Sequence, residues 1–185
     1  MIKSLPSIAA AAALLASSAV FAQNYIGAGI GQAAIADPCD GVASCKTAKV
    51  DLKLFGGYRL TPNWAAELNY FGFGQATLNG TGGYSATIKS NALGAGAAYF
   101  GAFSPKAIGV ARLGIARVKA DVTGLIGTLS STDSASSAHP YFGFGLGYAL
   151  SRTALIEADF DTSSVKYGGS SKNVRLLSAG LTYSF

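Results

Sequence analysis

One histidine with serines beside it is the arrangement in this chain that could support catalysis. His139 follows Ser136 and Ser137, and a histidine that removes the proton of a serine is the basis of nucleophilic acyl transfer. Serine is frequent throughout this stretch, however, and His139 precedes Pro140 at the start of an expected strand. We therefore interpret the histidine as incidental. We expect no catalytic residues and do not predict an enzyme.

Two cysteines offer a second kind of chemistry. Cys39 and Cys45 lie in a polar stretch, residues 36–46, that has the composition of a loop. In an exported protein such a pair predicts a disulfide, and two free thiols are the alternative. A zinc site would need further nitrogen or sulfur ligands, which one distant histidine does not complete. The glycine-rich segments match no phosphate-binding loop, because no helix pattern follows them. We therefore expect neither a metal nor a cofactor.

Ionisable residues that alternate with large apolar ones form the third set. Val50, Leu52 and Leu54 share one parity, and Lys53 has the other. In a strand, side chains of opposite parity point to opposite faces. Mixed charges on one enclosed face predict a mutually neutralising polar network, because an unpaired buried charge is costly. The expected members are Lys53, Glu67, Arg112, Glu157 and Asp159.

The N-terminus has the pattern of a targeting segment. Lys3 supplies a positive charge, residues 8–20 form a short apolar run, and Val20, Phe21 and Ala22 form a small-residue cleavage site. A retained helical anchor is the alternative. We predict a signal peptide over residues 1–22 and a single domain over residues 23–185.

The composition beyond this segment favours strands. Charged residues make up only 12% and the mean hydropathy is +0.34, yet no later apolar run reaches the roughly 18 residues of a spanning helix. The 24 glycines, nine tyrosines and ten phenylalanines favour β-structure. A net charge of +5 without a Lys/Arg cluster gives no reason to expect a nucleic-acid partner.

Eight alternating segments follow one another along the chain. Short connections at 61–63, 103–106 and 151–153 alternate with longer Gly-, Ser- and Thr-rich ones at 34–47, 78–86, 124–138 and 168–172. This asymmetry is typical of outer-membrane barrels, and an even strand number allows an antiparallel sheet to close. The expected strands are 24–33, 48–60, 64–77, 86–101, 107–123, 138–150, 154–167 and 173–185.

The two faces of these segments indicate which side meets lipid. Phe142, Phe144 and Leu146 share a face opposite Gly143 and Gly145. Glycines would weaken the strands of a soluble barrel for no gain, whereas in a narrow lumen they leave room for long charged side chains. We therefore predict an all-β fold, an eight-stranded antiparallel up-and-down transmembrane β-barrel with its apolar face outward. Five outward aromatic residues near the short turns predict an interfacial girdle: Tyr58, Trp64, Tyr99, Tyr148 and Phe185.

Several motifs resemble one known family. Residues 57–68 are similar to the second periplasmic hairpin of OmpA-like and opacity-type outer-membrane barrels, and residues 111–114 and 147–159 resemble their later strands. Leu181, Tyr183 and Phe185 resemble the terminal signal that the barrel-assembly machinery reads. The resemblance implies a bacterial outer-membrane location, and we expect no peptidoglycan-binding domain.

The sequence also departs from the family. Gly96, Gly147 and Leu155 stand where better-known relatives carry the charges of an interior switch. Only Glu67, Arg112 and Glu157 keep the family pattern, which argues against a family-like gate but leaves room for a narrow water path.

A structural or surface-interaction role follows from this fold. An eight-stranded barrel has an interior that side chains can fill, so we expect a plugged lumen and external loops that contact lipopolysaccharide, a host or other cells. A narrow porin-like channel for small solutes is the alternative. A closed barrel leaves no free edge, so we expect a monomer.

Three cations carry outward parity at the external end of the apolar band. Lys89, Arg117 and Arg175 each lie about ten residues from the periplasmic end of their strand, or roughly 25 Å up. Because guanidinium and ammonium groups pair with phosphate, we predict a lipopolysaccharide-binding rim. The alternative is that solvated cations merely end the apolar band.

The terminal motif predicts an assembly defect. Deleting Phe185 should sharply reduce insertion into the outer membrane, because the recognition signal is lost. The measurement is the surface level of the deletion mutant beside wild type in the same cells. Equal levels would count against the motif.

The cysteine pair predicts protection from alkylation. If Cys39 and Cys45 are joined, a thiol reagent should label neither in non-reduced protein taken from the outer membrane and both after reduction. Labelling of both without reduction would contradict the disulfide.

Overall fold

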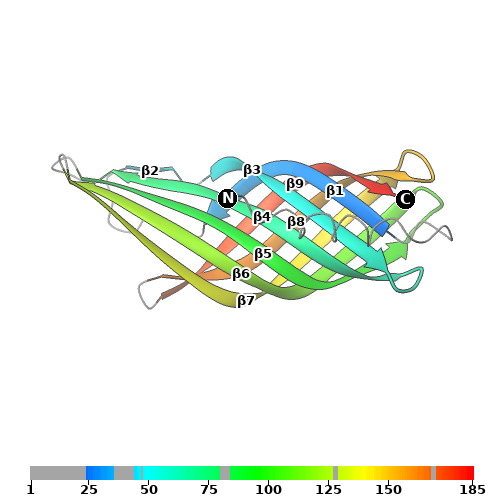
Figure 1. The fold of residues 1–185 in the computed structure, drawn as a ribbon. Helices are drawn as coiled ribbons and strands as arrows, with labels where there is room; N and C mark the ends of the chain where they lie inside the picture. The colour runs from blue at the N-terminus through cyan, green and yellow to red at the C-terminus, as the bar shows by residue number, and fades with distance from the viewer. Residues whose placement is uncertain (1–23, 36–43, 47, 80–83, 127–128, 168–169) are drawn as a thin grey trace, which may run out of the picture.

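The computed structural model describes residues 24–35, 44–46, 48–79, 84–126, 129–167 and 170–185 (Figure 1). The predicted signal peptide, Cys39 and the side chain of Cys45 lie outside the described residues.

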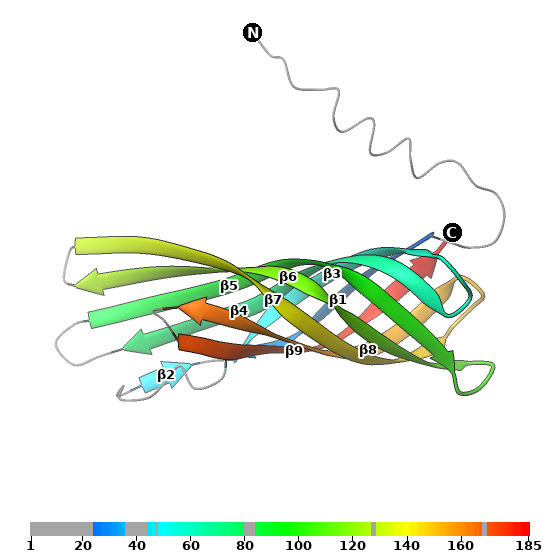
Figure 2. The same cartoon turned by 90° about the horizontal axis from the view of Figure 1, so that it is seen from below.

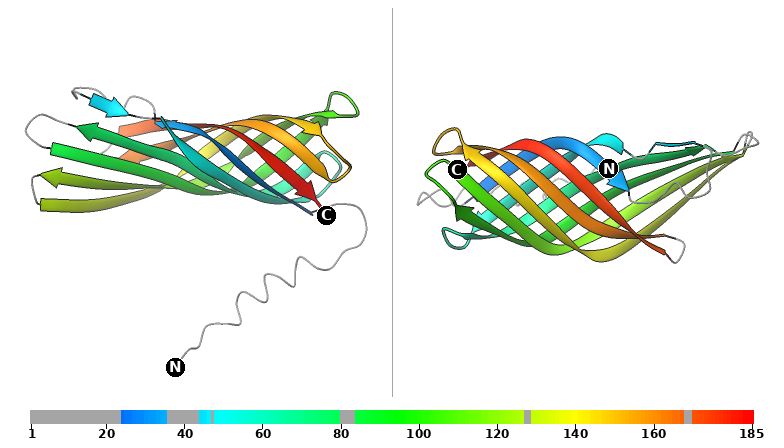
Figure 3. Two further views of the ribbon diagram at one scale, coloured as in Figure 1. Left: turned by 90° about the horizontal axis from the view of Figure 1, so that it is seen from above. Right: turned by 180° about the vertical axis from the view of Figure 1, so that it is seen from behind.

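Eight long antiparallel strands close into a barrel, as predicted (Figures 2 and 3). Each pairs with the next long strand in sequence, and the first pairs with the last, from Tyr25↔Ser184 to Ile35↔Val174. The long strands are β1 (Asn24–Ile35), β3 (Ala48–Arg59), β4 (Trp64–Asn79), β5 (Tyr84–Ala102), β6 (Ala107–Ile126), β7 (Leu129–Ala149), β8 (Ala154–Tyr167) and β9 (Ser170–Ser184). A short β2 (Ser44–Lys46) pairs with the external end of β4. Among the described residues, none forms a helix that could cross a membrane.

The short connections lie together at one end of the barrel, where the sequence predicted them. Each contains a hydroxyl side chain that accepts a hydrogen bond at 3.0 Å from the backbone N–H three residues later: Thr61 from Trp64, Ser104 from Ala107 and Ser151 from Ala154. Such side-chain bonds satisfy backbone groups that leave the ladder and favour a tight turn.

The two faces of the wall have the predicted orientation. Leu146 on β7 is 67% exposed, and the adjacent Gly145 and Gly147 are buried. All five aromatic residues of the expected girdle are exposed on the outer wall. Outward apolar side chains in every long strand therefore give the barrel a lipid-compatible surface.

The longer connections differ from the prediction. Residues 124–138 were expected to form a loop, but β6 and β7 remain paired out to Ile126↔Leu129. Much of 78–86 and 168–172 is likewise strand. Loop composition misled the prediction, because a two-stranded ladder continues wherever hairpin partners satisfy each other's backbone groups. At residues 131–134 of β7 both faces are exposed, so the ladder needs no apolar alternation there.

The wall divides at its external end. Pairing of β3 with β4 stops at Lys53↔Phe71, next to a β-bulge between Gly72 and Gln75. Gly74 in this bulge has φ of 81°, a conformation that favours glycine, and its N–H donates to Asp51 Oδ2 at 2.9 Å. Pairing of β7 with β8 stops at Phe142↔Thr162.

One of the resulting parts projects beyond the rest of the barrel (Figure 1). We call it the external sheet: β2 with residues 75–79 of β4, 84–92 of β5, 117–126 of β6 and 129–141 of β7.

Candidate functional site

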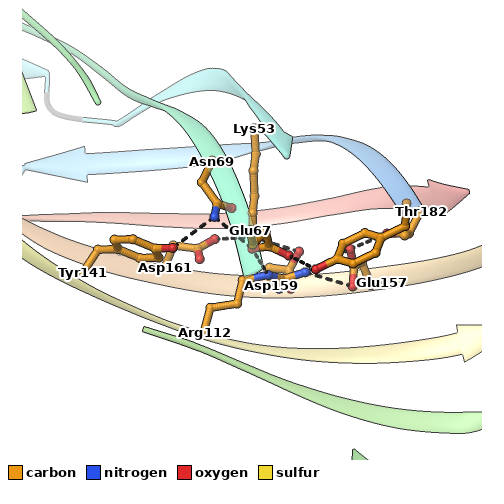
Figure 4. Close-up of polar contacts among 10 residues, drawn as sticks. Lys53, Glu67, Asn69, Arg112, Tyr141, Glu157, Asp159, Asp161 and Thr182 are labelled. Carbon is orange, nitrogen blue, oxygen red and sulfur yellow. Dashed lines mark hydrogen bonds and ion pairs between the residues drawn. The ribbon is translucent and has the colours of Figure 1, made fainter. Parts of the chain in front are cut away.

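A buried layer of ionisable side chains fills the middle of the barrel (Figure 4). Its members are at most 3% exposed: Lys53, Glu67, Arg112, Glu157, Asp159 and Asp161. They project from β3, β4, β6 and β8. The layer therefore connects strands from opposite sides of the wall.

Arg112 lies at the centre of this network. Its Nε is 3.0 Å from Glu67 Oε1, its Nη1 is 2.6 Å from Asp159 Oδ1, and its Nη2 is 3.4 Å from Glu157 Oε1. The planar guanidinium group has five N–H donors in a fixed geometry, so it can serve three carboxylates where a lysine could not reproduce the arrangement.

Lys53 forms the second cationic centre. Its Nζ is 2.7 Å from Asp161 Oδ2 and 3.1 Å from Asp159 Oδ2. The ring of Phe55 lies 5.3 Å from the same Nζ, within range of a cation–π contact. Asp159 contacts both Lys53 and Arg112 and so joins the two halves of the network.

By formal charge the carboxylates of the layer outnumber its cations. Two cations face four carboxylates, a formal sum of 2 − 4 = −2. Neutral groups supply further donors: Tyr25 Oη to Glu67 Oε2 at 2.7 Å, Asn69 Nδ2 to Glu67 Oε1 at 2.9 Å and Thr182 Oγ1 to Glu157 Oε1 at 2.6 Å. Hydrogen bonds to a buried carboxylate offset part of the cost of removing it from water.

Glycines on the inner wall make room for these side chains, as predicted. A Cβ on Gly143 would meet the Asp161 carboxylate, and one on Gly145 would meet Asp159 Oδ1. A Cβ on Gly57 would meet the ring of Tyr25. Larger residues at these positions would displace members of the network.

The interior also contains apolar layers, which the expectation of a lumen plugged by polar side chains did not include. An apolar cluster below the ion network includes Tyr25 and Phe100, whose rings lie 5.5 Å apart. Above it, toward the external end, Phe71, Phe73 and Tyr141 pack with aliphatic residues. The ion network therefore lies between two apolar layers.

The sequence reasoning missed four participants. Asp161 shares the inward parity of Glu157 and Asp159, so extending that alternation by two residues would have found it. Tyr25, Asn69 and Thr182 carry no charge, and nothing in the sequence distinguishes them from other inward polar residues.

The histidine and the two serines do not form one group. His139 Nε2 lies 2.8 Å from Ser137 Oγ. Ser136 has the opposite parity and accepts a hydrogen bond from Arg117 Nη2 at 3.2 Å on the outer face.

The three cations of the expected rim all face outward, but they are unevenly distributed. Lys89 and Arg117 lie on the paired strands β5 and β6, and Arg175 lies on β9, across the barrel. Lys119, which the prediction omitted, shares the parity of Arg117 and is 51% exposed, with its Nζ 2.9 Å from Asp121. We call Lys89, Arg117 and Lys119 the cationic patch.

The terminal motif lies on the outer wall. Leu181, Tyr183 and Phe185 are exposed, and the rings of the last two stack with centroids 6.5 Å apart. The N–H of Phe185 donates to Asn24 O at 2.9 Å, so the last residue takes part in closing the barrel.

The network predicts a large stability loss when its centre is removed. Arg112→Leu leaves Glu67, Glu157 and Asp159 short of their shared donor, which we expect to cost about 3–5 kcal/mol. The measurement is the temperature at which the heat-modifiable gel band of the barrel shifts. The shift temperature of Arg112→Lys should lie between those of wild type and Arg112→Leu, because lysine keeps the charge but lacks the planar set of N–H donors of the guanidinium group.

Arg152→Leu in an exposed periplasmic turn is the matched control and should change stability by less than about 0.5 kcal/mol. An Arg112→Leu band that shifts at the wild-type temperature would show that the network contributes nothing.

Comparisons with known proteins agree with the fold. The chain resembles the solved structure of Neisserial surface protein A (TM-score 0.61, 16% identity, covering 88% of this chain and 97% of that one). It also resembles Ail, the attachment invasion locus protein of Yersinia pestis, in complex with the heparin analogue sucrose octasulfate (TM-score 0.57, 16% identity, covering 87% of this chain and 98% of that one). A third similar structure is the outer membrane protein OprG from Pseudomonas aeruginosa (TM-score 0.55, 18% identity, covering 88% of this chain and 96% of that one). At these identities the likeness concerns the fold alone.

No curated protein matches the chain in sequence. The family described as the outer membrane protein beta-barrel domain matches residues 5–185. This match covers nearly the whole chain and agrees with a closed, outwardly apolar barrel. The chain therefore belongs to the outer membrane protein beta-barrel family and resides in the bacterial outer membrane.

Proposed function

We propose that the protein is a closed structural barrel that presents the external sheet for contacts at the cell surface. The observation that carries this proposal is the ion network, which fills the lumen between two apolar layers. Within the proposal, the signal peptide is cleaved after Ala22 and the barrel-assembly machinery inserts a monomer.

The geometry of the network favours a closed lumen. Moving Arg112 out of the barrel axis would separate it from three buried carboxylates at 2.6–3.4 Å. Removing one partner of a buried pair costs about 3–5 kcal/mol, which corresponds to an open population of roughly one molecule in 10² to 10⁴. Such a barrel contributes a rigid anchor rather than a permanent pore.

The external sheet and its cations support a surface role. Arg117 and Lys119 of the cationic patch line a hollow of about 400 Å³ that includes Tyr70 and Leu93 from the apolar band. Cations beside apolar side chains suit a ligand with phosphate and acyl groups, such as lipopolysaccharide. Sucrose octasulfate, the polyanion in the Ail complex, has comparable charge chemistry. Adhesion to a host or another cell would use the same exposed part of the molecule.

A narrow channel for small solutes is the second candidate. Four buried polar atoms have no hydrogen-bond partner within the described residues: Asn69 Oδ1, Ser90 Oγ, Asp161 Oδ1 and Ser178 Oγ. Water molecules in the lumen would satisfy these atoms, and a continuous file of water would conduct.

Conductance of the purified barrel in a planar bilayer separates the two candidates. We expect no stable open level for wild type, because the ion network closes the lumen. The double variant Arg112→Ala/Asp159→Ala removes both bridging residues and should produce open events. A steady wild-type conductance would favour the channel instead.

Lipopolysaccharide retention tests the surface contact. Exchanging Lys89, Arg117 and Arg175 together for glutamine should lower co-purifying lipopolysaccharide about threefold to tenfold, because each exposed cation contributes a modest pairing energy. Lys106→Gln in a periplasmic turn is the control, since it lies at the opposite end of the barrel. Equal retention in the triple variant and wild type would contradict the rim.

A further inference from the structure

The external sheet ends in an unpaired strand edge on β7. Within the described part of the chain, residues 129–141 pair with β6 but have no partner strand on the β8 side. The β6–β7 hairpin and the β8–β9 hairpin point apart at this end (Figures 1 and 2).

Proline explains where the edge begins. Ala149 donates its N–H to Lys106 O on the β6 side, whereas Leu150 donates to Ala154 O on the β8 side. Backbone groups alternate in direction along a strand, so the even-numbered residues of β7 face β8. Pro140 is even-numbered and lacks an N–H, so it cannot donate to β8 at the point where the ladder stops. Its carbonyl accepts instead from Ser163 Oγ at 3.0 Å.

Beyond Pro140 the edge can accept a strand. By the same alternation, Thr132, Ser134, Ser136 and Ala138 direct N–H and C=O groups outward from the sheet. The N–H of Ser134 bonds only locally, to Asp133 Oδ1 at 2.8 Å. Asp133 is the only charged residue between 129 and 139, and natural edges are usually blocked by lysine, proline or bulges. Small side chains along this edge leave its backbone accessible.

The charges beside the edge specify the kind of strand. On the outer face of β5 and β6, Lys89, Arg117 and Lys119 accompany one acid, Asp121, a local sum of 3 − 1 = +2. Arg117 and Lys119 lie on β6, the strand next to β7, and Lys89 lies one strand further away on β5. Arg117 already extends across to β7, where its Nη2 donates to Ser136 Oγ. Carboxylates at alternate positions of an added strand would therefore meet a positive surface.

A second copy in the same membrane fits less well. A two-fold axis along the membrane normal would place the same residues of both edges at the same height, N–H against N–H, which forms no ladder. It would also bring two cationic patches together.

We propose that the β7 edge, residues 130–138, binds an extended acidic segment of another protein by β-strand addition. Main-chain hydrogen bonds to the even-numbered residues hold the segment, and the cationic patch selects acidic side chains at alternate positions. This inference rests on the proposed surface role and names a class of partner for it.

A peptide of alternating threonine and glutamate is the probe, and its affinity for the full barrel in phospholipid nanodiscs without lipopolysaccharide is the measurement. Ser136→Pro removes one N–H from the free edge without touching the β6 ladder and should weaken binding at least tenfold. Ser136→Ala keeps that N–H and should bind as wild type does. Equal affinities of these two variants would overturn the proposal.

A second matched pair of variants tests the preference for acidic side chains. Arg117→Gln should weaken binding about threefold to tenfold, whereas Arg175→Gln, an outward cation across the barrel, should have no effect. Equal losses in the two variants, or equal binding of a peptide with lysine in place of glutamate, would overturn the acidic preference.

Hydrogen exchange provides a readout that needs no variant. Addition of the peptide to wild type should slow exchange of the Ser136 and Ala138 amides, and unchanged exchange would refute strand addition. Self-association of the barrel that protects the same amides without peptide would assign the edge to a second copy and overturn the proposal. The peptide could fail to bind to a barrel that shows no conductance in a planar bilayer and retains lipopolysaccharide. In that case the proposed function stands and this inference falls.

Discussion

Backbone hydrogen bonding inside a bilayer is the constraint on which the rest of this structure depends. Lipid offers no partner for an N–H or C=O group, so each must bond within the sheet, and the sheet must close. The β1–β9 ladder and the bond from Phe185 to Asn24 complete that closure. Closing eight strands leaves an interior only as wide as its own side chains. The lumen therefore has to be packed, and the charged residues that enter it have to find partners there.

The same constraint ends at the external edge of the membrane, and the wall changes there. Toward the external end, β4 has a bulge at Gly74 and β7 contains Pro140, and each feature lies where a ladder to a neighbouring strand stops. Side chains satisfy the backbone at both places, since Asp51 accepts from the Gly74 N–H and Ser163 donates to the Pro140 carbonyl. Neither would be tolerated at the same cost within the hydrocarbon region. The divided wall produces the projecting sheet with its free edge.

The alternation of apolar and polar residues predicted those features of the fold that depend on contact with lipid. Composition gave the wrong secondary structure beyond the membrane, where that contact ends. Strand number, short turns and outward parity follow from a two-residue period that lipid on one side enforces. Residues 131–134 are all exposed, so both faces meet water there. Their serines and threonine indicated a loop, although they form a ladder with β6. Within the lumen, parity located the charged residues, but it could not indicate that Phe71 and Phe73 form an apolar layer above them. Their neighbours come from strands distant in sequence, and one strand's pattern carries no information about them.

The ion network also bears on the register of the barrel. A slip of one residue in β6 would turn Arg112 toward lipid, at a cost of about 2–4 kcal/mol near the midplane. It would also leave Glu67, Glu157 and Asp159 without their shared donor. Apolar residues at these positions would fill the space but would penalise a slipped register far less, because they are accepted on either face. A buried charge that contacts β4 and β8 at once therefore makes one arrangement of these strands strongly preferred over its neighbours, even where its net contribution to stability is small.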